Sequence, residues 1–216
     1  MNPVYSDSLC KKSIRLSEEQ QDVLNELVNI GFGRAASSLS MLVNQRVLLN
    51  VPQFQICQVD QIPGSLNGLA QGELVNVHQL FHGKLNGHTM LLLDVTSASR
   101  LVDLLNGGTG QSGPLTAISQ EALAEVGNVV INAFLGAFGN LLKIHLSFTV
   151  PSIKIETLVQ ILHSLLIKDG NSTFAMIFKL RFQLSQQDIS GYLVVVMGDQ
   201  PLEALLQALK TEGMLS

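Results

Sequence analysis

Two long segments of the chain repeat apolar residues at the spacing of an amphipathic helix. The first covers residues 17–42 and begins at Ser17, which forms a capping-box sequence with the glutamine three positions later. The second covers residues 119–142 and carries an acid, Glu121, in its first turn, where the helix dipole favours negative charge. We therefore predict a long helix near the start of each half of the chain.

Alternation of apolar and polar residues predicts six strands, at residues 47–57, 75–81, 88–94, 146–156, 175–184 and 192–197. Short turns separate the second strand from the third and the fifth from the sixth, so we expect these pairs to form antiparallel hairpins. A short helix is predicted after each hairpin, at residues 97–106 and 201–210. The remaining connections within each half are too short for helical crossovers, and none is predicted.

Three positions recur with a constant shift of 99 residues, which indicates an internal duplication. They are Glu26, Asn29 and Pro52 in the first half, and Glu125, Asn128 and Pro151 in the second. We predict a tail at residues 1–16 and one domain at 17–216, built of repeats 17–107 and 115–210, with the Gly-rich segment 107–114 between them. The expected fold class is α+β, with approximate two-fold symmetry, a six-stranded mainly antiparallel sheet and two long exposed helices.

The repeated Glu and Asn lie on the polar face of each predicted helix, within roughly 60° of one another around its axis. The two polar arcs consist of Asp22, Glu26 and Asn29, and of Glu121, Glu125 and Asn128. The two apolar arcs consist of Val23, Leu24, Leu27, Val28 and Ile30, and of Ala122, Leu123, Val126, Val129 and Val130. A solvated polar face is the ordinary role of such residues. Their repetition at one distance from a proline, where packing does not demand them, indicates a function instead.

The remaining features of the sequence have structural interpretations. The two prolines are expected to begin strands, because no ladder hydrogen bond is lost there. Gly31 and Gly33 follow the first motif inside its helix, and we interpret them as points of close approach between helix and sheet.

Composition narrows the classes of function. The net charge is −4 and no basic cluster extends beyond Lys11 and Lys12, which argues against nucleic acid and anionic membranes as partners. Cys10 and Cys57 have no metal-binding or redox spacing, the five histidines are scattered, and no catalytic Ser/His/Asp or Cys/His arrangement is found. No metal site is predicted. Neither a leader sequence nor a membrane-spanning stretch is recognised, so a soluble cytoplasmic protein is expected.

The duplicated pattern resembles the signature of the CheC/CheX/FliY chemotaxis phosphatases, Asp/Ser-x3-Glu-x2-Asn-x22-Pro. The first copy matches in full at Asp22, Glu26, Asn29 and Pro52, whereas the second departs from it with Glu121 in the leading position. The similarity extends from about residue 17 to 210. Its two copies are similar to CheC rather than to single-motif CheX, and no motor-switch module of the FliY kind is recognised after Lys210.

This resemblance implies hydrolysis of the aspartyl phosphate of a CheY-type response regulator. It implies that Asn29 and Asn128 orient the attacking water, while Glu26 and Glu125 pair with a lysine of the regulator. Asp22 and Glu121 would contact the partner at the rim of the interface. The chain itself is expected to bind no cofactor, and Mg²⁺ is expected on the regulator. A CheD-type protein is a further possible partner, and the internal duplication makes a monomer plausible.

Two other interpretations stay open at this stage. The chain could be an interaction protein without catalysis, which docks on a regulator, a CheD-type partner or the flagellar switch through the same helices. It could also be a generic α+β ligand-binding domain in which the motif is accidental, and such a domain should contain a deep pocket.

Overall fold

The computed structural model describes residues 16–66, 69, 72–141, 143–168, 174–184 and 186–213, so most of the predicted tail at 1–16 lies outside the described residues. The described residues form one seven-stranded sheet. Its strands are β1 (Val47–Gln58), β2 (Glu73–Gly83), β3 (Gly87–Asp94), β4 (Leu146–Phe148), β5 (Ser152–Thr157), β6 (Phe174–Leu184) and β7 (Gln187–Met197). The helices are α1 (Glu18–Val43), α2 (Ile62–Ser65), α3 (Val95–Leu105), α4 (Ala117–Leu141), α5 (Leu158–Lys168) and α6 (Asp199–Gly213), with a 3₁₀ turn η1 (Val59–Gln61). The predicted α+β class is confirmed.

The sheet joins strands from both halves of the chain in the order β1-β6-β7-β3-β2, with β4 and β5 both beyond β2. The two predicted hairpins are confirmed, because β2 pairs with β3 and β6 with β7, both antiparallel. Strands β3 and β7 pair at the centre. The strand that follows each long helix pairs with a strand of the other half of the chain, an arrangement that we call strand exchange. Strand β1 pairs with β6 of the C-terminal half, and β5 pairs with β2 of the N-terminal half.

The predicted strand at 146–156 is wrong as one element, since it breaks into β4 and β5. At the break, the Thr149 backbone N–H donates to the Leu80 carbonyl, and the Thr149 hydroxyl accepts from the Leu80 N–H, both at 3.0 Å. Pro151 follows, and it has no N–H with which to continue a ladder. The six predicted strands therefore become seven.

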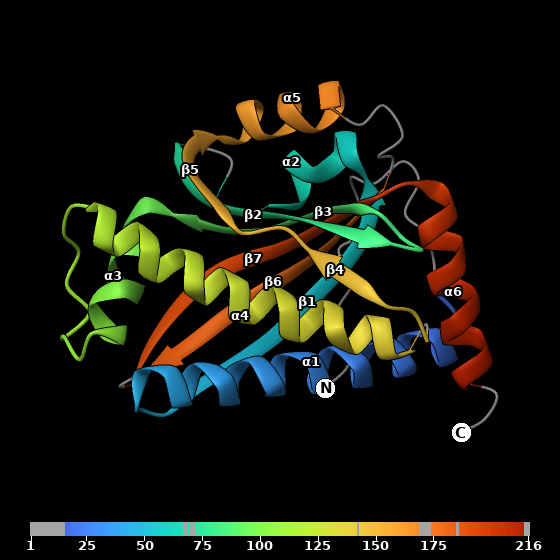
Figure 1. Cartoon of the computed structure of the whole chain (residues 1–216), viewed down its shortest axis with the longest axis horizontal. Coiled ribbons are helices and arrows are strands. Elements are labelled where there is room, and N and C mark those ends of the chain that lie inside the picture. Colours follow the sequence, from blue (N-terminus) through green and yellow to red (C-terminus); the bar gives the residue numbers. More distant parts are fainter. Residues whose placement is uncertain are drawn as a thin grey trace.

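Both faces of the sheet are covered by helices (Figure 1). Helices α1 and α4 lie side by side on one face, while α2 and α5 lie on the other. The prediction that no helix interrupts the strands of a half is wrong in both halves, because α2 connects β1 to β2 and α5 connects β5 to β6. The reason is that the sheet is apolar on both faces: Val194, Val196 and Leu92 belong to a second core that Ile161 and Leu165 of α5 cover.

The start of α1 forms as predicted. The Gln20 N–H donates to the Ser17 hydroxyl at 3.2 Å, and the Ser17 N–H donates to the Gln20 side-chain oxygen at 2.9 Å, which completes the capping box. Asn44 ends the helix in the left-handed conformation at a φ of 49°. Three buried rings, Phe32, Phe134 and Phe178, join α1, α4 and β6 in the main core, with centroids of Phe32 and Phe134 4.9 Å apart.

Two glycines show how closely α4 packs. A Cβ on Gly31 would lie 3.2 Å from the Phe134 Cα, so this glycine permits an approach between two helices. The interpretation of Gly31 as a helix–sheet contact is therefore wrong, and Gly33 has nothing within 4 Å of a Cβ. The close helix–sheet approach occurs instead at Gly127 of α4, where a Cβ would lie 2.5 Å from the Val77 Cγ1 of β2.

Helix α4 is also long and apolar enough to cross a membrane by length and composition alone, although the sequence analysis expected no membrane-spanning stretch. In the fold, 56% of its most apolar window is buried inside the protein. The core helix of a globular domain has the same properties.

Candidate functional site

The first motif lies on the outer face of α1. Asp22, Glu26 and Asn29 are all exposed, and Leu24, Leu27 and Val28 are buried beneath them, while Val23 is half-buried. Ile30 departs from the prediction, because 43% of its surface is exposed beside Asn29. Within the described part of the chain, the side chains of Asp22, Glu26 and Asn29 make no hydrogen bond or ion pair. The carboxylate and the carboxamide are therefore available to another molecule.

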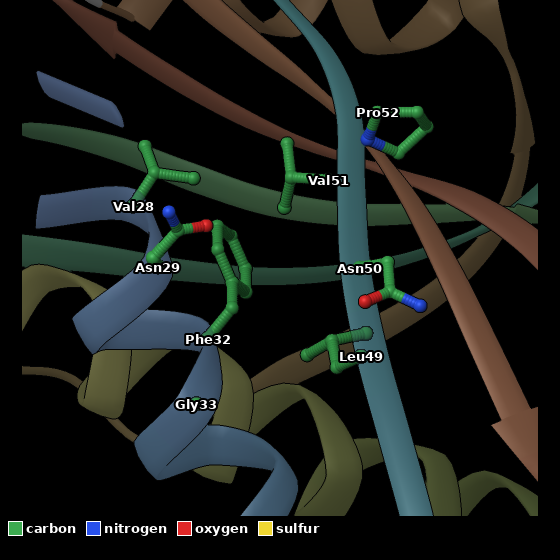
Figure 2. Close-up of a pocket in the computed structure, with 8 residues that line it drawn as sticks. All are labelled: Val28, Asn29, Phe32, Gly33, Leu49, Asn50, Val51 and Pro52. Carbon is green, nitrogen blue, oxygen red and sulfur yellow. The ribbon is translucent and has the colours of Figure 1, made fainter. Parts of the chain in front are cut away.

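Asn29 borders a hollow of about 340 Å³ between α1 and β1. Its lining residues are Val28, Asn29, Phe32, Gly33, Leu49, Asn50, Val51 and Pro52. Figure 2 shows the Asn29 side chain pointing from α1 toward β1, beside the Phe32 ring. The hollow is partly open to solvent.

Pro52 lies inside β1, so the prediction that it begins a strand is wrong. The register between β1 and β6 shifts between Asn50 and Gln53, which places Pro52 in a β-bulge of an edge strand. A bulge on an edge is a position where proline removes no ladder hydrogen bond. Asn29 on α1 and Pro52 on β1 line the same hollow from its two sides. Their spacing in the sequence therefore corresponds to the length of chain that finishes α1 and runs back along β1. Pro151 directly precedes β5, as predicted.

The second motif is arranged differently. Glu121 and Glu125 are exposed on α4, but Asn128 is half-buried, contrary to the prediction of an exposed side chain. Its Oδ1 accepts hydrogen bonds from the Gln79 Nε2 at 3.2 Å and from the Asn132 Nδ2 at 2.8 Å. Both carboxylates are thus presented to solvent, whereas the amide is tied to the protein itself.

Gln79 belongs to the interior, with only 1% of its surface exposed. Besides Asn128, its Nε2 donates to the Thr149 carbonyl at 2.9 Å. Sequence analysis did not single out Gln79 or Asn132. The available signal was a polar residue among the inward positions of β2, between Val77 and Phe81, which are both buried.

Two large apolar residues near the second motif in the sequence are exposed. Ile118, one turn before Glu121 on α4, has 75% of its surface exposed, and Val150, next to Pro151, has 87% exposed.

The structure also brings together two histidines that the sequence left scattered. His78 of β2 and His88 of β3 face each other with 2.9 Å between Nε2 and Nδ1, on the face of the sheet opposite the motifs. No group of three or more His, Cys, Asp or Glu side chains with metal-binding geometry occurs among the described residues.

Comparisons with known proteins agree with this arrangement. The CheC-like family profile matches residues 19–56, which span α1 and most of β1 and include the first motif. CheY-P phosphatase CheC of Bacillus subtilis is 24% identical over 200 residues, which cover 90% of this chain and 95% of that protein. The flagellar motor switch phosphatase FliY of Bacillus subtilis is 30% identical over 96 residues, 44% of this chain and 24% of that longer protein.

The fold has a close counterpart among solved structures. The crystal structure of FliY from Thermotoga maritima superposes with a TM-score of 0.71 at 20% identity, and the match covers 92% of this chain and 99% of that chain. The predicted resemblance is therefore confirmed, since this chain is similar to CheC and FliY in sequence and to FliY in fold.

Proposed function

We propose that this protein is a phosphatase that hydrolyses the aspartyl phosphate of a CheY-type response regulator. The observation that carries the proposal is the exposed Glu26–Asn29 pair, one helical turn apart and without partners in the described part of the chain. The curated relatives CheC and FliY are named as phosphatases, and the name of CheC gives CheY-P as its substrate.

In the proposed reaction, Asn29 enters the phosphorylated pocket of the regulator and holds a water in line with the phosphorus–aspartate bond. The carboxamide suits this role because it donates and accepts hydrogen bonds without a charge that would repel the phosphoryl group. The water oxygen bonds to phosphorus, and the electron pair of the breaking P–O bond returns to the aspartate carboxylate. Both water protons leave on the released dihydrogen phosphate. Positioning accounts for most of the catalysis in such transfers, so one well-placed amide suffices.

The other polar residues of α1 serve the docking of the regulator. Glu26 lies one turn before Asn29, and we propose that it pairs with the lysine that the family resemblance implies in the regulator. Such an ion pair fixes orientation and gains strength as the interface excludes water. Asp22, a further turn away, contacts the rim. Mg²⁺ belongs to the regulator, and none is required from this chain.

We further propose that residues 17–107 and 115–210 are repeats and that Glu121, Glu125 and Asn128 form a second site. The exchanged strands support this proposal, since β1 pairs with β6 and β5 pairs with β2, as two copies of one unit would. The internal pairing of the halves favours a monomer. We also propose a cytoplasmic location, as the proposed regulator substrate implies, and a CheD-type protein as a candidate second partner.

The test is release of phosphate from a CheY-type regulator that has been phosphorylated with radiolabelled acetyl phosphate. The wild-type protein should accelerate the release, and Asn29→Ala combined with Asn128→Ala should reduce the acceleration about a hundredfold. Asn140→Ala is a matched control, because Asn140 is also an exposed amide on α4 and lies about 18 Å along the helix from Asn128. Binding of the regulator without any acceleration would support the interaction-protein alternative instead.

A further inference from the structure

The two motifs hold their asparagines in different states. Asn29 makes no hydrogen bond within the described part of the chain, whereas the Asn128 Oδ1 accepts two, from Gln79 and Asn132. A carboxamide oxygen has two lone pairs, so both acceptor positions of Asn128 are in use.

The orientation of the Asn128 amide is set by its surroundings. The Gln79 Nε2 donates to the Thr149 carbonyl at 2.9 Å, and a carbonyl can only accept, so this end of Gln79 must be its NH₂ group. The atom of Asn128 that faces the same nitrogen at 3.2 Å must then be an acceptor, its Oδ1. Rotating the Asn128 amide by half a turn would place two NH₂ groups against each other.

This orientation matters for catalysis. A water that attacks phosphorus directs a lone pair at the phosphorus and needs an acceptor for one of its protons. With both acceptor positions of its oxygen occupied, Asn128 can only donate from Nδ2, and it has no acceptor left for a proton of the water. The amide must therefore break its bonds to Gln79 and Asn132 before it can orient the water.

The first site lacks both of these restraining groups. The position 99 residues before Asn132 is Gly33, which leaves open space beside Asn29. The strand pairs give the counterpart of Gln79. Gln53 pairs with Lys179, and Ser152, the residue equivalent to Gln53 in the second half, pairs with His78, so Lys179 is equivalent to His78. The next residue along each strand is then Leu180 in one half and Gln79 in the other. Leu180 is fully buried and has no polar group to offer. The hollow of about 340 Å³ lies where the second site has its hydrogen-bonded amides.

We propose that the two sites are inequivalent: Asn29 carries the hydrolysis, and Gln79 and Asn132 act as positioning residues that hold Asn128 in an inactive orientation. This inference rests on the proposed phosphatase function and concerns the division of work between its two sites. It assigns Gln79 and Asn132 a role that neither residue type nor position alone would reveal.

The experiment uses the full-length protein and the regulator assay described above. Asn29→Ala should lose most of the wild-type rate, and Asn128→Ala should keep most of it. In the Asn29→Ala background, Gln79→Leu with Asn132→Ala should raise the remaining rate about tenfold, since two hydrogen bonds of ordinary strength no longer hold the amide. The same pair of substitutions in Asn29→Ala/Asn128→Ala should give no gain.

A gain of activity cannot come from damage to the fold, which makes this readout specific. Asn132→Ala alone leaves the core strand intact and releases one of the two bonds, so it should give a gain of about threefold even if Gln79→Leu impairs folding. No gain from Asn132→Ala in a protein whose thermal unfolding is unchanged overturns the inference. So does a wild-type-like rate in Asn29→Ala.

These outcomes separate the inference from the function on which it rests. If the wild-type protein releases no phosphate, the proposed function itself is wrong and the inference falls with it. If the wild-type protein is active and the two asparagines contribute equally, only the inequivalence of the sites is wrong.

Discussion

The close approach of α4 to β2 at Gly127 predicts opposite effects for one substitution at two positions of the same helix. A Cβ at Gly127 would lie 2.5 Å from the Val77 Cγ1 and 2.9 Å from the Val77 Cβ, whereas a Cβ at Gly136 meets nothing within 4 Å. Val77 is fully buried in β2, so it cannot move into solvent to make room. Gly127→Ala must therefore displace α4 from the sheet, and Gly136→Ala need displace nothing.

The magnitude follows from comparing the two variants. Carbon atoms in ordinary contact are about 3.5–4.0 Å apart, so the new methyl group overlaps Val77 by roughly 1 Å. Overpacking of a tight core costs about 1–3 kcal/mol. In a helix interior, alanine is favoured over glycine by about 1 kcal/mol, and this gain is common to both variants. Gly136→Ala should therefore stabilise the protein by about 1 kcal/mol, and Gly127→Ala should be about 1–3 kcal/mol less stable than that variant.

Urea unfolding followed by circular dichroism measures both free energies. Adding Val77→Ala to Gly127→Ala removes the nearest clashing atom, the Val77 Cγ1 at 2.5 Å, and keeps only the Cβ at 2.9 Å. The two substitutions should therefore show a favourable coupling of about 0.5–3 kcal/mol in a double-mutant cycle. Equal stabilities of Gly127→Ala and Gly136→Ala, or no coupling between Gly127→Ala and Val77→Ala, would refute the close packing of α4 on β2.

Three further predictions concern docking, capping and pH. Glu26→Gln should raise KM for the phosphorylated regulator about tenfold and make KM less dependent on salt, with kcat little changed, because Glu26 serves docking. Initial rates at two ionic strengths test this expectation. A fall in kcat without a change in KM contradicts it. Ser17→Ala removes the cap of α1 and should cost about 1 kcal/mol in urea unfolding, whereas Ser37→Ala at an exposed mid-helix position should cost little. Burial raises the pKa of Tyr192 above its usual 10.0, so the neutral phenol stabilises the fold fully below pH 10.0, and this contribution is lost as the pH rises through the folded-state pKa. Unfolding at several alkaline pH values should show a steeper loss of stability for the wild-type protein than for Tyr192→Phe.

The long helices and the hairpins could be predicted because their signals are local. Ser17 and Gln20 form a capping box within one turn, and the β2–β3 and β6–β7 pairs are joined by short turns. Helix α5 was missed because its reason is tertiary: the second face of the sheet is apolar and must be covered, which no segment reveals by itself. The bulge at Pro52 was missed for the same reason, since a register shift exists only relative to the partner strand β6.

The candidate site was predictable where it depends on one helix and not where it depends on two elements. The spacing of Asp22, Glu26 and Asn29 places them on one face of α1, and all three are exposed. Glu125 and Asn128 have the same spacing, yet Asn128 is half-buried, because Gln79 reaches it from a strand 49 residues earlier in the chain. A repeated motif thus predicts where side chains project from a helix, but the groups that meet them come from the rest of the fold.

The exchange of strands makes each candidate site depend on both halves of the chain. The wall of the hollow beside Asn29 is β1, and β1 is held in the sheet by β6 of the C-terminal half. Likewise, Asn128 of the C-terminal half is held by Gln79 on β2 of the N-terminal half. Neither half could present its asparagine in the observed surroundings alone, because the supporting strand belongs to the other half. Substitutions in one half therefore change the environment of the motif in the other half. In this way two copies of one motif can come to differ in the hydrogen bonding of their asparagines.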